Sequence, residues 1–144
     1  MACNYSTELV VCILKVTLDL NMLSKKNILV IDDEETILTM TKSVLQNDYN
    51  VTTVNSAMAA LNLFLEGYTP HLILLDLNMP EISGWEALLR IRSLSNLLHI
   101  QIAIYTSSDD PKDKKKAKEM GAVDYIHKPI SKEELLEKTA KLLK

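Results

Sequence analysis

Short apolar runs alternate along the chain with longer stretches in which apolar residues recur every three or four positions. Three runs are unbroken, Ile28–Ile31, Leu72–Leu75 and Ile102–Tyr105, which is typical of parallel strands buried on both faces. Two others, Val51–Val54 and Val123–Ile126, include polar residues and suit the edges of a sheet. Each run precedes a stretch of helical period, so the pattern predicts five β-then-α units.

These units predict an α/β fold, a doubly wound five-stranded parallel sheet with helices on both faces. Because the first, third and fourth strands are the most apolar, we place them in the centre of the sheet. This is the flavodoxin-like order 2-1-3-4-5 of a (βα)5 domain. Polar residues that favour helix starts precede four of the periodic stretches: Ser56, Ser83, Asp110 and Ser131.

We divide the chain into an N-terminal extension, residues 1–24, and one α/β domain, residues 25–144. The role of the extension is open: it can be an extra amphipathic helix, a disordered tail or a misassigned start, with Met22 as an alternative first residue. Its apolar run Leu9–Leu14 is short and is followed by Lys15 and Asp19. We therefore expect neither membrane insertion nor a secretory signal, and a cytoplasmic location.

Charge and cysteines narrow the function classes. The formal net charge of −3 provides no overall basic field, so direct binding to nucleic acid is not expected. The two cysteines, Cys3 and Cys12, have no histidine or cysteine partner at the spacing of a metal site. They fit a reducing compartment and do not indicate a function.

Polar residues with chemical potential stand where the predicted strands end. Asp32 and Asp33 follow the first strand, Asp76 the third, Thr106 the fourth and Lys128 the fifth. The carboxyl ends of parallel strands face one crevice in which ligands bind. Three carboxylates, a hydroxyl and a lysine in one crevice suit phosphoryl chemistry with a divalent metal.

In this order and at these strand ends, Asp32-Asp33, Asp76, Thr106 and Lys128-Pro129 resemble the receiver domain of two-component response regulators, in particular the single-domain, chemotaxis-regulator-like kind. The resemblance covers residues 25–144. It implies that Asp76 accepts a phosphoryl group from a histidine kinase or a phosphotransfer protein. It also implies a signalling module that catalyses only its own phosphorylation and dephosphorylation.

The acidic cluster requires a counter-ion, because two carboxylates about 4 Å apart repel by about 4 kcal/mol at an effective dielectric constant near 20. Mg²⁺ suits oxygen ligands, waters and a phosphate oxygen. The resemblance implies that Asp33, Asp76 and the backbone carbonyl of Asn78 bind Mg²⁺ directly, with Asp32 acting through water. It places Lys128 beside Asp76, and then beside a phosphoryl oxygen.

The same resemblance implies a switch. The Thr106 hydroxyl moves to the phosphoryl group, and the Tyr125 ring turns inward behind it. Pro129 follows Lys128 in a cis peptide that fixes the lysine's loop. Three positions adjust access to the phosphoryl group and its hydrolysis: Asn78, Ser107 and Ser108.

We expect the output surface on the helix that contains Lys112–Lys118, with the fifth strand and the last helix. That helix offers only Ala117 and Met120 as anchors and should be loosely held. The expected partner is a downstream protein, with a homodimer of this domain as one form. The N-terminal extension is the competing interface.

Other readings of the site fit less well. A haloacid dehalogenase-type phosphatase needs a second aspartate two residues after its nucleophile, and Asn78 stands there, which cannot transfer a proton. A flavin or dinucleotide site needs a glycine-rich turn after the first strand, where Asp32–Glu35 would repel phosphate. A receiver-like scaffold without phosphorylation is disfavoured by the complete acidic set. We expect a single-domain regulator, with a fragment of a longer regulator or hybrid kinase as the alternative.

Overall fold

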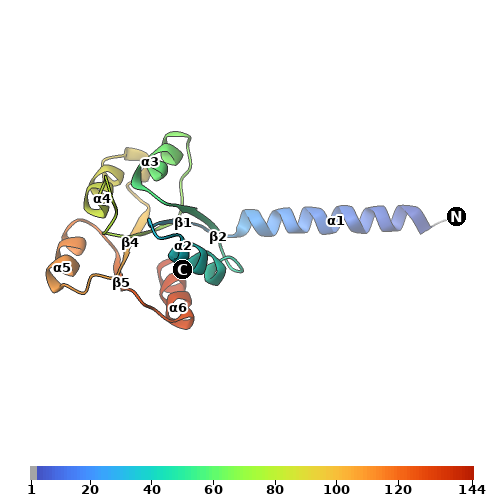
Figure 1. Ribbon diagram of the computed structural model, residues 1–144. Coiled ribbons are helices and arrows are strands. Elements are labelled where there is room, and N and C mark those ends of the chain that lie inside the picture. Colours follow the sequence, from blue (N-terminus) through green and yellow to red (C-terminus); the bar gives the residue numbers. More distant parts are fainter. Residues whose placement is uncertain (1–2) are drawn as a thin grey trace.

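The computed structural model describes residues 3–144, except for the side chains of residues 3–5, 21–23 and 95. Five strands alternate with helices after a long first helix (Figure 1). The elements in chain order are α1 (Cys3–Ser24), β1 (Asn27–Ile31), α2 (Glu35–Leu45), β2 (Asn50–Val54), α3 (Ala57–Leu65), β3 (Leu72–Leu75), α4 (Gly84–Arg92), the 3₁₀ helix η1 (Ser95–Leu97), β4 (Gln101–Thr106), α5 (Pro111–Glu119), β5 (Asp124–His127) and α6 (Lys132–Leu142).

The strands form one parallel sheet in the order β2-β1-β3-β4-β5, which confirms the predicted topology. The central strand β3 is buried at all four positions. The edge strand β2 is only half-buried along its whole length, as its threonines indicated. The last strand begins and ends one residue later than predicted, at Asp124 and His127.

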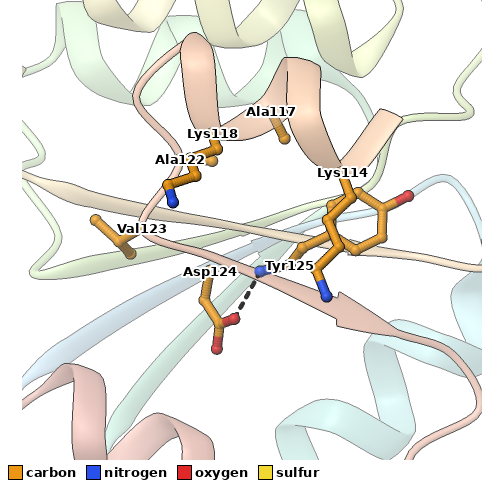
Figure 2. Close-up of a pocket in the computed structure, with 7 residues that line it drawn as sticks. All are labelled: Lys114, Ala117, Lys118, Ala122, Val123, Asp124 and Tyr125. Carbon is orange, nitrogen blue, oxygen red and sulfur yellow. Dashed lines mark hydrogen bonds between the residues drawn. The ribbon is translucent and has the colours of Figure 1, made fainter. Parts of the chain in front are cut away.

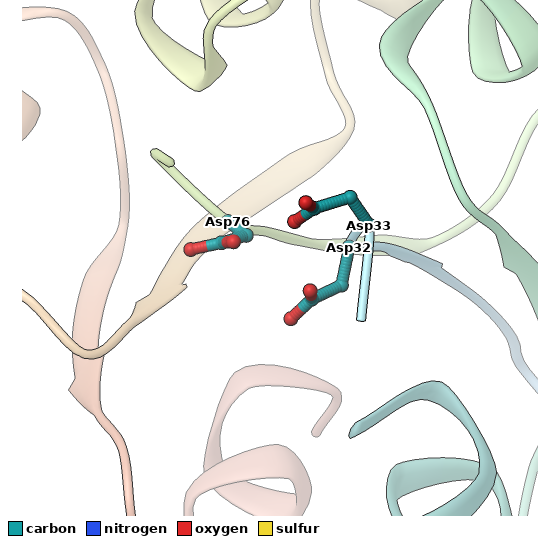
Figure 3. A group of neighbouring side chains, drawn as sticks. All are labelled: Asp32, Asp33 and Asp76. Carbon is teal, nitrogen blue, oxygen red and sulfur yellow. The ribbon is translucent and has the colours of Figure 1, made fainter. Parts of the chain in front are cut away.

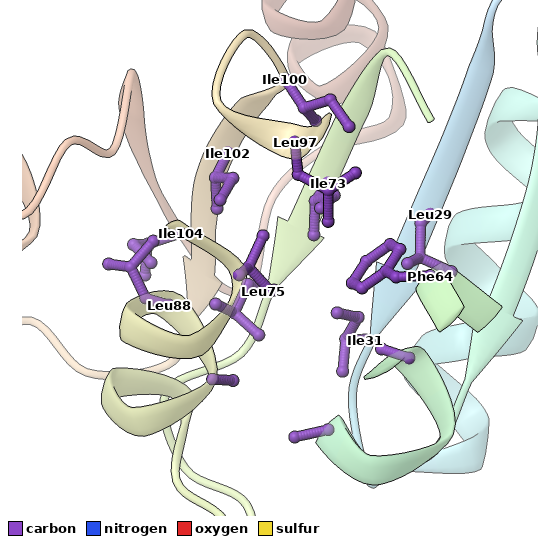
Figure 4. Close-up of a cluster of buried hydrophobic side chains, with 14 of the residues drawn as sticks. Leu29, Ile31, Phe64, Ile73, Leu75, Leu88, Leu97, Ile100, Ile102 and Ile104 are labelled. Atoms are coloured by element: carbon purple, nitrogen blue, oxygen red, sulfur yellow. The ribbon is translucent and has the colours of Figure 1, made fainter. Parts of the chain in front are cut away.

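Two aliphatic cores lie on opposite faces of the sheet, because successive side chains of a strand point to opposite sides. On β1, Leu29 and Ile31 contribute to the core under α3 and α4 (Figure 4). Ile28 and Val30 contribute to the other core, with residues of α2 and α6. The helices thus cover both faces of the sheet, as a doubly wound fold requires.

Helix starts follow the predicted caps. The side chains of Ser56, Ser83 and Ser131 each accept a hydrogen bond from the backbone N–H three residues later. Asp110 accepts one from the N–H of Lys112, and Pro111 occupies the first turn of α5. These bonds satisfy N–H groups that have no partner within the helix.

Helix α5 is anchored weakly. Its only fully buried residue is Ala117, and Met120, just after the helix, is half-buried against the core. The Lys116 ammonium adds a contact 4.3 Å from the centre of the Trp85 ring on α4. The solvated lysine face and the few buried anchors agree with the prediction, and the loose attachment of the helix stays a prediction.

Helix α1 projects away from the sheet (Figure 1), and the described side chains from Ser6 to Leu20 are exposed. The extension is helical in the structure, as the first of the three interpretations has it, and Met22 as an alternative first residue stays a prediction. Among the described residues, no helix is long and apolar enough to cross a membrane. The division into an extension and a domain at residue 25 stays a prediction.

Candidate functional site

The backbone brings the three aspartates together. The N–H of Asp76 donates to the carbonyl of Ile31 (3.0 Å) at the end of β1, so Asp76 leaves β3 beside Asp32 and Asp33. One carboxylate oxygen from each aspartate lies within 4.8 Å of the others (Figure 3). Asp32 and Asp76 are buried, and Asp33 is exposed to solvent. This is an acidic cluster that reaches solvent at Asp33.

Lys128 supplies the positive charge. The ammonium forms a buried ion pair with Asp32 and lies 3.9 Å from Asp76 Oδ1. The resemblance placed Lys128 beside Asp76, and the structure has this contact, but the closer contact is to Asp32. The reason is physical: the side chain passes over the Tyr105 ring (4.9 Å) to Asp32, which is fully buried and whose charge most needs a cation. The Lys128–Pro129 peptide is cis, as predicted.

Asp76 has a perturbed environment. Burial raises the pKa of its carboxyl group above the ordinary 3.8, by more than the Lys128 ammonium lowers it. The carboxylate of Asp32 adds to this rise in pKa, while hydrogen bonds from the Thr106 side chain and the Asn78 backbone lower it. A buried carboxylate held by several donors is suited to act as an oriented nucleophile.

The loop after β4 connects Thr106 to the α5 side of the molecule. Thr106 is fully buried, and its Oγ1 accepts a bond from the N–H of Ser108 (3.4 Å). The Ser108 hydroxyl donates to Asp113 Oδ2 on α5 (2.7 Å). The Tyr125 hydroxyl donates to the carbonyl of Ser108 (2.8 Å). Ser108 therefore links the site, helix α5 and the Tyr125 ring, a role that sequence reasoning did not assign to it.

A hollow of about 260 Å³ lies between α5 and β5, next to the Tyr125 ring (Figure 2). Two lysines line it together with small or aliphatic side chains, an aspartate and the tyrosine. The lining residues are Lys114, Ala117, Lys118, Ala122, Val123, Asp124 and Tyr125. This hollow is on the face that the sequence predicted for output.

Gly84 is a site residue that the sequence analysis missed. A Cβ atom there would lie 2.2 Å from the backbone oxygen of Asp76 and 2.5 Å from the Cα of Leu77. The N–H of Gly84 donates to the Leu77 carbonyl (2.9 Å), which fixes the loop after Asp76 to the start of α4. The available signal was a glycine in a first helical turn, where glycine otherwise costs stability.

The donor set fits a hard divalent cation. Carboxylate oxygens from Asp32, Asp33 and Asp76 converge, and such ligands suit Mg²⁺. Two further predicted positions lie at the same carboxyl ends of the strands. The Asn78 N–H donates to Asp76, and the carbonyl of Ser107 is 3.1 Å from His127 Nε2. The sequence-predicted residues are thus gathered at one end of the sheet.

Known proteins resemble the chain in sequence. The family model of the response regulator receiver domain matches residues 28–140. Two-component response regulator ORR6 of Oryza sativa subsp. japonica is 34% identical over 110 residues, 74% of this chain and 65% of that protein. ORR13 of the same plant is 30% identical, covering 75% and 90%. A probable cyclic di-GMP phosphodiesterase of Vibrio cholerae is 34% identical over 76% of this chain but only 24% of that protein.

Solved structures of receiver domains also resemble this chain in fold. The chemotaxis protein CheY4 of Vibrio cholerae superposes with a TM-score of 0.77 and 28% identity, over 83% of this chain and 99% of that chain. A CheY-like receiver domain protein from Methanospirillum hungatei gives 0.74 and 30%, over 83% and 94%. The chain therefore belongs to the response regulator receiver domain family.

Proposed function

We propose that the chain accepts a phosphoryl group on Asp76 from the phosphohistidine of a histidine kinase or phosphotransfer protein, and thereby switches a protein-interaction surface. Receiver domains interact with such donors and bind Mg²⁺ at an acidic pocket. The observation that supports the proposal is the convergence of three carboxylates, with Lys128 and Thr106 beside Asp76.

In this proposal Asp33, Asp76 and the backbone carbonyl of Asn78 would hold Mg²⁺, and Asp32 would act on it through a water. When bound, the ion neutralises part of the acidic cluster and stabilises charge on the phosphoryl oxygens. Lys128, already near both buried aspartates, then pairs with a phosphoryl oxygen.

The chemical step is a displacement at phosphorus. A carboxylate oxygen of Asp76 forms a P–O bond as the P–N bond to the donor imidazole breaks, and the imidazole nitrogen keeps the electron pair. Because the transition state spreads charge over the phosphoryl oxygens, oriented donors supply most of the catalysis. Hydrolysis of the acyl phosphate returns the carboxylate, at a rate adjusted by Asn78, Ser107 and Ser108. The chain then catalyses only its own phosphorylation and dephosphorylation.

Signal output follows the bonds around Ser108. When the Thr106 hydroxyl turns to the phosphoryl group, it stops accepting the Ser108 N–H, and the loop that holds Tyr125 and Asp113 shifts. The weakly anchored α5 then moves with β5 and α6.

We propose that a downstream protein binds this face, with pairing of two copies of the domain as an alternative. We also propose that the protein acts in the cytoplasm and does not bind nucleic acid directly. Within the site, Pro129 has the separate role of fixing the loop that contains Lys128.

The test is chemical labelling. Acetyl phosphate with Mg²⁺, followed by borohydride reduction and mass spectrometry, should label Asp76 alone. Asp76→Asn should lose the label, whereas Asp109→Asn, an exposed aspartate after β4, should keep it. Label on another residue, or labelling without a divalent ion, would contradict the assignment.

Calorimetry and NMR test the other roles. Asp33→Ala should weaken Mg²⁺ binding more than Asp32→Ala, because of these two aspartates only Asp33 is proposed to contact the ion directly. Thr106→Ala should accept phosphate yet lose the phosphorylation-induced shifts around Tyr125. Equal affinities in the first pair, or full shifts in the second experiment, would refute these roles.

A further inference from the structure

Helix α1 has an unusual surface. Eight of its large aliphatic side chains are each 52% to 63% exposed, whereas monomeric proteins rarely expose a contiguous apolar patch larger than about 300–600 Å². Helices in proteins are stabilised mostly by the packing of an apolar face, and α1 has no such packing within the described part of the chain. The eight residues are Leu9, Val10, Val11, Ile13, Leu14, Val16, Leu18 and Leu20.

Seven of the eight apolar residues form two rows along α1, and Val11 lies beside the second row. The α1 seam, spaced four, three and four residues apart as in a coiled coil, consists of Leu9, Ile13, Val16 and Leu20. The α1 back row, spaced four apart on the other side, consists of Val10, Leu14 and Leu18. The charged residues share one narrow stripe, because they are spaced seven and four apart: Glu8, Lys15 and Asp19. Thr17 donates its hydroxyl to the Ile13 carbonyl (2.8 Å) and adds no unmet polar group.

A lipid surface does not suit this helix. Within the described residues, α1 is not long and apolar enough to cross a membrane, and helices that lie on membranes have a polar face rich in lysine and arginine. The charged stripe has two acids and one lysine instead.

The described part of the receiver body offers no matching face. Only Lys25 and Lys26 connect α1 to β1, and Figure 1 shows the helix leaving the sheet. The exposed large apolar residues of the described body are spread over several elements. They are Met40, Met58, Leu65, Leu89, Leu98 and Val123.

We propose that α1 packs against the α1 helices of other copies of this chain, in a bundle of at least three helices. A standard interface buries about 800 Å² per partner, about 60% of it apolar. Eight aliphatic residues, each just over half exposed, present on the order of 800 Å² of mostly apolar area. A two-helix contact on the α1 seam would use about half of this, so a stable association must cover the α1 back row as well.

The experiment measures the mass of the full-length chain in solution by light scattering and sedimentation at several concentrations. The wild type should have the mass of three or more chains. The α1 seam variant Ile13→Lys/Val16→Lys should be a monomer. The α1 back-row variant Leu14→Lys/Leu18→Lys should fall to a dimer or monomer. Asp19→Lys, which changes the charge by the same amount on the charged stripe, should keep the wild-type mass.

Circular dichroism and phosphorylation of Asp76 should show that the receiver body is intact in each variant. A monomeric wild type at every concentration, a wild type that stops at a dimer, or an unchanged mass in both double variants would overturn the proposal. Binding of a monomeric wild type to neutral or acidic phospholipid vesicles, abolished by either double variant, would overturn it in favour of a lipid surface. None of these outcomes bears on whether Asp76 is phosphorylated.

Discussion

The three central strands carry two regions of opposite character. Their interiors are aliphatic and fully buried, for example Leu74 of β3, whereas their carboxyl ends bury charged groups such as Asp32 and Asp76. The first region releases free energy on folding, because apolar surface leaves water. The second region opposes folding, because carboxylates are desolvated and crowded. The comparison shows that burial of the aliphatic interior offsets the free energy that the desolvated and crowded carboxylates of the site cost on folding.

The largest expected effect is in the aliphatic interior. Leu74→Ala should lower the free energy of unfolding by about 2–5 kcal/mol, since the transfer free energy is lost and a cavity remains. Urea titration followed by circular dichroism measures this loss. Leu65→Ala, at a leucine that is 80% exposed at the end of α3, should change stability by less than about 0.5 kcal/mol. Similar losses in the two variants would show that the comparison is wrong.

Gly84→Ala should act where the two regions meet. An alanine usually stabilises a helix relative to glycine, but here its Cβ would lie 2.2 Å from the Asp76 backbone oxygen. We expect a loss of about 1–3 kcal/mol and slower phosphorylation, because the loop after Asp76 must shift. Denaturation and the acetyl phosphate assay measure both quantities. A stabilised variant with wild-type labelling would contradict this packing role.

Lys128→Met should lower stability by about 2 kcal/mol without metal, because Asp32 and Asp76 lose their cation while the apolar stem is kept. Added Mg²⁺ should recover more stability in this variant than in the wild type. Thermal unfolding with and without Mg²⁺ measures the difference. The matched control is Lys138→Met, whose partially exposed pair with Asp124 (3.8 Å) should contribute at most about 0.5 kcal/mol.

Asp76→Asn should raise stability in metal-free solution at neutral pH, by about 1 kcal/mol. The pKa of Asp76 is raised by burial, so the folded state prefers its protonated form. Its stabilising contribution is complete below the unfolded value of 3.8 and is lost as the pH rises through the raised folded value. The advantage of the asparagine variant should therefore grow with pH across this window and then level off. An advantage that shrinks as the pH rises would contradict the assigned direction.

The smallest effect should come from a surface charge pair on α4. Arg90 Nη2 lies 2.5 Å from Glu86 Oε1, with both side chains nearly half exposed. Arg90→Gln should cost about 0.3 kcal/mol and less in high salt, as exposed pairs four residues apart do. Urea titration at two salt concentrations checks this. A cost comparable to that of Lys128→Met would remove the distinction between buried and exposed charge.

Sequence patterns predicted the fold because the strands differ in burial, and burial determines their composition. Ile28–Ile31 and Leu72–Leu75 are apolar on both sides, so their central places followed at once. The candidate site followed from strand ends that must share one edge. The closer contact of Lys128 with Asp32 could not be predicted from the strand ends, because it depends on how deeply each carboxylate is buried. The tight contact of Gly84 depends on the path of a loop, which local patterns do not encode.

A final consequence concerns Lys26, whose ammonium donates to the carbonyl of Leu143 (2.6 Å) at the end of α6. The bond places a cation at the negative end of that helix and couples α6 to the base of α1. A helix of 22 residues is about 33 Å long, so a tilt of about 10° at its base moves the far end by about 6 Å. A small rotation of α6 transmitted through this bond would therefore be enlarged at the far end of α1, and spin labels near the two ends of the helix would record it.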